Sequence, residues 1–81
     1  MHAGILTLDL HGKNTYQAKL TVDALLRRAG TGTYRIRLIH GHHGGTALRD
    51  LLRSEYAHHP KVKRLISSSD GATELVLREY V

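Results

Sequence analysis

Two short polar motifs combine residue types that can move protons or hold a phosphate. The first places Asp9 and His11 at the end of an alternating apolar run, and residues two apart in a strand share a face. A carboxylate beside an imidazole can perform general acid–base catalysis, with the carboxylate orienting or polarising the ring. The same pair also has a structural interpretation, in which Asp9 caps a turn and His11 bonds a backbone carbonyl.

The second motif is the run His-Gly-His-His-Gly-Gly-Thr at residues 40–46. A Gly-rich loop that leads into a helix exposes backbone N–H groups and the positive end of the helix dipole, both of which suit a phosphate. Two other interpretations stay open: the glycines supply only positive φ angles, or His40, His42 and His43 bind a metal. The candidate catalytic residues are Asp9, His11 and His40, and the candidate phosphate-binding residues are Gly41, His43, Gly44, Gly45 and Thr46.

The elements that must position these residues follow from hydrophobic periodicity. Alternation predicts strands at residues 5–10, 34–40, 62–67 and 73–78. An apolar stripe from Ala18 to Ala29 predicts a helix, with Asn14 as its N-cap and Gln17 completing a loose capping box. Thr46 is the expected N-cap of a second helix, and its buried stripe consists of Leu48, Leu51, Leu52 and Tyr56.

The order β-α-β-α-β-β predicts a single two-layer α/β sandwich with a mixed four-stranded sheet, spanning residues 1–81 as one domain. The first two strands are joined through a helix and should run parallel, whereas the last two should form a hairpin. Ligands bind at the carboxyl ends of parallel strands. We therefore expect Asp9 and His11 to lie near residues 40–43.

Composition narrows the classes of protein. The chain has 81 residues and no cysteine, which excludes a disulfide scaffold, a thiolate zinc site and a cysteine nucleophile. The longest apolar run is far shorter than the roughly 20 residues that span a bilayer, and the N-terminus has no signal-peptide pattern. We expect a cytoplasmic protein that does not bind membranes, with a monomer as the expected oligomeric state.

Basic residues exceed acidic ones by 12 to 7, for a formal net charge of +5. Such a surplus on a small domain favours nucleic acid as partner, although it also serves to keep a protein in solution. The chain has no Phe or Trp for base stacking, which favours recognition of backbone or structure. The candidate nucleic-acid-binding residues are Lys13, Arg35, Arg37 and Arg49, with solvated surface positions as the alternative for the two strand arginines.

The motifs together resemble a known family. L-D-L-H-G at residues 8–12, L-I-H-G at 38–41, T-A-L-R at 46–49 and D-G-A-T at 70–73 follow one another in an order and at a length similar to the small MutS-related (Smr) domain. The resemblance covers nearly the whole chain. It implies the fold order βαβαββ, binding of DNA or RNA, and in many members endonuclease activity.

Residue roles follow from the same resemblance. Asp9 and His11 match the L-D-x-H motif implicated in cleavage, and His40 and Gly41 match the start of the motif H/T-G-x-G. The chain departs from the family at His43, where the second glycine of that motif falls, and its loop is one residue longer or shifted.

Three functions remain as hypotheses: an endonuclease, a nucleic-acid-binding module without catalysis, and a small protein–protein adaptor. For the endonuclease, metal-assisted cleavage needs hard oxygen ligands, of which Asp9 is the one strong candidate. Metal-free RNA cleavage through the 2′-OH needs only acid and base groups, which favours RNA. No cofactor is assigned, and Mg²⁺ and Mn²⁺ stay open.

Overall fold

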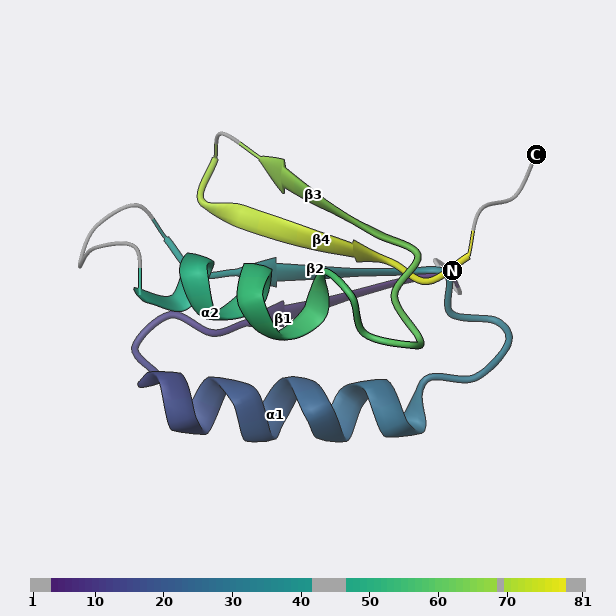
Figure 1. The fold of residues 1–81 in the computed structure, drawn as a ribbon, viewed down its shortest axis with the longest axis horizontal. Helices are drawn as coiled ribbons and strands as arrows, with labels where there is room; N and C mark the ends of the chain where they lie inside the picture. The colour runs from purple at the N-terminus through teal and green to yellow at the C-terminus, as the bar shows by residue number, and fades with distance from the viewer. Residues whose placement is uncertain (1–3, 42–46, 69, 79–81) are drawn as a thin grey trace.

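The backbone forms one mixed four-stranded sheet and two helices in the order β-α-β-α-β-β (Figure 1). The structure is a computed structural model and describes residues 4–41, 47–68 and 70–78. The elements are β1 (Ile5–Asp9), α1 (Thr15–Arg28), β2 (Arg35–Ile39), α2 (Ala47–Tyr56), β3 (Arg64–Ser68) and β4 (Ala72–Val76). This architecture confirms the predicted fold class.

The strands lie in the order β1-β2-β4-β3. β1 and β2 are parallel, as expected, and β4 runs antiparallel to both β2 and β3. The carboxyl ends of β1, β2 and β3 therefore share one end of the sheet with the start of β4, at the left of Figure 1. The first residue of β1 and the last of β4 lie at the opposite end, where Ile5 and Val76 are both paired with Arg35.

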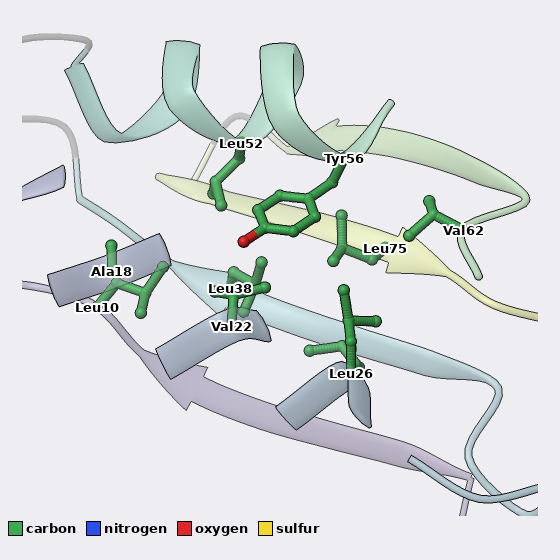
Figure 2. Packing of buried hydrophobic residues seen from close by; sticks show 10 residues of the cluster. Leu10, Ala18, Val22, Leu26, Leu38, Leu52, Tyr56, Val62 and Leu75 are labelled. Carbon is green, nitrogen blue, oxygen red and sulfur yellow. The ribbon is translucent and has the colours of Figure 1, made fainter. Parts of the chain in front are cut away.

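Both helices cover one face of the sheet. Cross-strand pairing aligns one apolar residue from each strand on this face, in the row Leu6, Ile36, Leu75 and Leu65. Figure 2 shows side chains from α1, α2 and the sheet converging on the same space. The fully buried members of this core include Leu10, Ala18, Val22, Leu26, Leu38 and Leu52.

The start of α1 is fixed by the predicted capping box. Asn14 Oδ1 accepts from the Gln17 backbone N–H at 2.8 Å, and Gln17 Oε1 accepts from the Asn14 N–H at 3.1 Å. These two bonds satisfy donors that a helix start leaves without intrahelical partners. The cap sets the direction in which α1 leaves the loop after β1.

Tyr56 ties α2 to α1. Its ring is buried in the core (Figure 2), and its hydroxyl donates to Asp23 Oδ1 at 2.7 Å. Lys19 Nζ donates to the other oxygen of Asp23, also at 2.7 Å. Burial, followed by the bond to Asp23, raises the pKa of Tyr56. The hydroxyl therefore stays protonated and remains a donor between the helices.

The observed strand bounds differ from the predicted ones by one or two residues. The third strand begins at Arg64 instead of residue 62, because the Val62 N–H donates to His59 O at 2.9 Å in a turn. β4 is buried on both faces, since Val76 is fully buried although it faces away from the helices. Its cross-strand neighbours are Arg35 and Arg64, whose aliphatic stems can cover it. Within the described ranges, no helix has the length and hydropathy to cross a bilayer.

Candidate nucleic-acid interface

Three segments that are far apart in the sequence meet at the end of the sheet where β1 and β2 finish (Figure 1). They are the loop after β1, the residues after β2 and the turn between β3 and β4. Each contains a glycine with positive φ: Gly12 at 86°, Gly41 at 85° and Gly71 at 83°. Side chains with a Cβ rarely adopt this conformation. These glycines let all three segments turn sharply at the same place.

Asp9 holds the backbone of His11. Asp9 Oδ1 accepts the His11 N–H at 2.8 Å, and both residues are exposed. Between them, Leu10 is fully buried and its N–H donates to Ile39 O at 2.7 Å. The turn-capping interpretation of Asp9 is therefore present in the structure. It fixes where His11 leaves the strand, and it leaves the imidazole in solvent.

The His11 ring lies beside Gly41. A Cβ placed on Gly41 would sit 3.7 Å from His11 Cδ2. The structure thus brings the first motif against the start of the second, as the sequence predicted. Gly41 keeps the space next to the ring open, and its own N–H donates to Gly71 O at 2.9 Å. Because that N–H is already hydrogen-bonded within the protein, Gly41 leaves room beside the His11 ring but offers no free donor to a ligand.

His40 is hydrogen-bonded through both ring nitrogens. Nδ1 donates to Gly41 O at 3.1 Å, and Nε2 lies 2.9 Å from Thr73 Oγ1. Because a carbonyl oxygen only accepts, Nδ1 carries the proton, and Nε2 of the neutral ring accepts from the Thr73 hydroxyl. Thr73 is fully buried. His40 is thus a fixed, partly buried part of the scaffold, unlike the exposed His11.

The turn between β3 and β4 supports the end of β2. Gly71 O accepts from the N–H groups of both His40 and Gly41 at 2.9 Å. Within the turn, Ser68 Oγ donates to Asp70 Oδ1 at 2.6 Å, and Arg37 forms a close ion pair with Asp70. The Ser68 hydrogen bond, followed by the one from Arg37, lowers the pKa of Asp70. The turn between β3 and β4 therefore fixes the position of the first two residues of the second motif, His40 and Gly41.

Sequence reasoning placed Asp70 and Gly71 in a turn and Thr73 at the start of a strand, but it assigned none of the three to the candidate site. The signal was present, because D-G-A-T at residues 70–73 was one of the runs that carried the family resemblance. The structure explains the run residue by residue. Asp70 anchors the turn, Gly71 accepts from the end of β2, and Thr73 bonds the His40 ring.

The predicted nucleic-acid-binding residues separate into two groups. Arg35 and Arg37 lie on the sheet face away from the helices, where Glu74 pairs with Arg35 at 3.0 Å and with Arg37 at 3.1 Å. Arg35 begins β2, about 13 Å of strand away from the site end. Lys13 is exposed beside the first motif, and its side chain forms no hydrogen bond or ion pair with any residue that the structure describes.

Arg49 lies in the first turns of α2, and its Nε is 3.7 Å from Asp50 Oδ1. Four of the five predicted phosphate-binding residues, His43, Gly44, Gly45 and Thr46, fall outside the described residues, as does His42. The described residues contain no group of three or more His, Asp or Glu that could hold a metal ion. The predictions for the loop and for a histidine metal cluster therefore stay predictions.

Comparisons with known proteins agree on one family. The sequence profile of the Smr domain matches residues 8–78. Among solved structures, the fold is similar to the Smr domain of Thermus thermophilus MutS2, with a TM-score of 0.80 and 30% sequence identity, covering 91% of this chain and 99% of that one. No curated protein sequence matches the chain. The profile match includes all three segments that meet at the site end of the sheet.

Proposed function

The chain belongs to the Smr domain family, a family of nucleic-acid-binding and nuclease-type domains, and we propose that it is an endonuclease acting at the end of the sheet that carries Asp9 and His11. The observation that carries the proposal is the exposed His11 imidazole. Among the described residues it is the one exposed imidazole at this end, whereas the His40 ring is hydrogen-bonded within the protein through both nitrogens.

His11 is the general acid–base residue in this proposal. An imidazole takes and returns a proton near neutral pH. His11 would remove the proton from the attacking hydroxyl, which is a water or the 2′-OH of RNA. A new P–O bond forms, the bond from phosphorus to the leaving oxygen breaks, and that oxygen takes up a proton from water. Asp9 is a positioning residue, because it holds the His11 backbone at 2.8 Å.

These steps assign no role to a divalent ion, and Mg²⁺ and Mn²⁺ stay open as cofactors of the reaction. Asp9 is the single carboxylate of the first motif, and Asp70, at the same end, is committed to Arg37 and Ser68. The described residues therefore form no set of ligands that would hold Mg²⁺ or Mn²⁺ on its own. Lys13 would hold the nucleic-acid backbone through charge, and the binding should weaken with salt.

The test is a cleavage assay with end-labelled linear, branched and single-stranded DNA and RNA, each with Mg²⁺, Mn²⁺ or a chelator. We expect wild type to produce products and His11→Ala to lose them, by on the order of 100-fold or more in rate. The matched control is His58→Ala, which removes an exposed histidine beyond the far end of α2. Equal cleavage by His11→Ala and wild type would reject His11 as the acid–base residue.

One observation favours a second function, a nucleic-acid-binding module without catalysis. Phosphodiester cleavage needs one group to take a proton and one to return it, and His40 has both ring nitrogens bonded. Of the described imidazoles at this end, only His11 has its ring nitrogens unbonded. The module predicts binding of the same substrates in a fluorescence anisotropy titration without products. Absence of both binding and cleavage at low salt would instead support a protein–protein adaptor.

A further inference from the structure

Two large apolar side chains are exposed on α1, the helix that begins shortly after the first motif. Tyr16 is 71% exposed and Leu20 is 52% exposed, and they lie one helical turn apart on the same face. The Tyr16 ring has no hydrogen bond and no ring contact with any described residue. An aromatic ring left open in this way offers a flat apolar surface with a polar edge.

The position of Tyr16 follows from the capping box. Tyr16 lies five positions after His11 and three positions after Lys13. Its Cα therefore lies at most about 18 Å from the Cα of His11 and at most about 11 Å from that of Lys13. The Asn14 cap fixes α1 to begin directly after the first motif. Figure 1 shows the first turn of α1 at the same end of the molecule as the ends of β1 and β2.

The charges near Tyr16 in the chain indicate which kind of ligand the ring can bind. Lys13, three positions before Tyr16 in the chain, is exposed, the first turn of α1 contains no acidic residue, and the chain carries a net charge of +5. An exposed ring that lies close in the chain to a cation without an ion pair among the described residues suits a ligand with a flat face and a negatively charged backbone. A nucleotide strand has both. In a duplex the base faces are covered by their neighbours, so only an unpaired base can stack on such a ring.

We propose that Tyr16 is a stacking platform for an unpaired base of the nucleic acid bound at the Asp9–His11 end. The proposal rests on the proposed function and deepens it, because it specifies a substrate with a single-stranded or unpaired segment near the bound phosphate. It also revises the expectation that this chain recognises nucleic acid without stacking. That expectation came from the absence of Phe and Trp, and it did not foresee an exposed tyrosine.

The test compares a dye-labelled single strand with a blunt duplex of the same sequence by fluorescence anisotropy. Tyr16→Ala should weaken binding of the single strand roughly tenfold and leave duplex binding within about twofold. Tyr16→Phe keeps the ring and should bind like wild type. Tyr16→Leu keeps apolar bulk without the ring and should resemble Tyr16→Ala. Lys13→Ala should weaken both ligands, since a phosphate contact does not distinguish them.

A second readout reports stacking directly. A single strand with 2-aminopurine at successive positions should show a fluorescence change at one position on binding, and Tyr16→Ala should abolish that change. Equal losses for strand and duplex, or full binding by Tyr16→Ala, would overturn the platform while leaving the proposed function standing. Wild type that binds neither ligand would overturn both. A dimer that Tyr16→Ala dissociates, with nucleic-acid binding unchanged, would show that the ring covers a second copy instead.

Discussion

The end of β2 is held by two groups that are distant in the sequence, one in the turn between β3 and β4 and one at the start of β4. The Gly71 carbonyl accepts two backbone N–H groups, and the Thr73 hydroxyl donates to His40 Nε2. These contacts decide the orientation of the His40 ring and the position of Gly41. Because Gly41 faces His11, the same contacts decide how much space lies next to the candidate catalytic ring.

Thr73→Val should destabilise the protein by about 1–2 kcal/mol. The change keeps the shape of a fully buried side chain but leaves His40 Nε2 without its donor. Urea unfolding measures the difference. Thr7→Val is the matched control, because Thr7 is exposed on β1 and its replacement should change stability by less than about 0.5 kcal/mol. Equal effects of the two changes would show that the bond to His40 contributes nothing to folding.

Asp70→Asn should change how stability depends on pH. Ser68 and then Arg37 hold the pKa of Asp70 below its ordinary value of 3.8, so the unfolded chain binds this proton more readily than the folded protein. The stability that the carboxylate contributes is complete above that ordinary value and is lost as pH falls through the lowered pKa. Unfolding midpoints of wild type and variant should differ most above about pH 5 and should approach each other as the pH falls below the ordinary value and through the lowered pKa. A constant difference over that range would contradict the assignment.

The candidate site was predictable where its residues are close in sequence. Asp9 and His11 stand two positions apart, and their types alone indicated proton transfer. The bonds from Thr73 to His40 and from Asp70 to Arg37 each join residues 33 positions apart, so no local pattern could reveal them. The pairing of Arg35 and Arg37 with Glu74 was hidden for the same reason.

α1 combines a structural task with the proposed binding task, since its first turn carries both the cap and Tyr16. Asn14→Ala should cost about 1 kcal/mol, because it removes the acceptor for the Gln17 N–H. Asn14→Gly should lower the free energy of unfolding by only about a few tenths of a kcal/mol. Urea unfolding of the three proteins checks the order. Identical stabilities for the alanine and glycine variants would show that the cap bond is not what stabilises this helix start.

Helices and strands with clear periodicity were predicted with the right type and order. The capping box of α1 is local, and it was confirmed atom by atom. The burial of β4 on both faces was not predicted from its sequence. Burial of Val76 depends on which strands lie beside β4. That order, β1-β2-β4-β3, is a property of the sheet rather than of any one segment.

The net charge of +5 is distributed unequally over the molecule. The arginines of β2 are neutralised by Glu74 and Asp70, whereas Lys13 is unpaired among the described residues. Lys13→Ala should therefore reduce the slope of log Kd against log salt concentration by about 0.7–0.9. Arg35→Ala should leave that slope unchanged. Anisotropy titrations between low and physiological salt measure both slopes, and a larger change for Arg35→Ala would mean that the open sheet face contacts the strand.

The first residue of β1 and the last of β4 lie at the same end of the sheet, away from the strand ends that carry Asp9 and His11. A five-residue strand, about 17 Å long, therefore stands between either attachment point and the site. A linker, a resin or a sensor chip can therefore be attached at the end of the sheet opposite Asp9 and His11. The tethered domain then presents the end of the sheet that carries Asp9 and His11 to the surrounding solution.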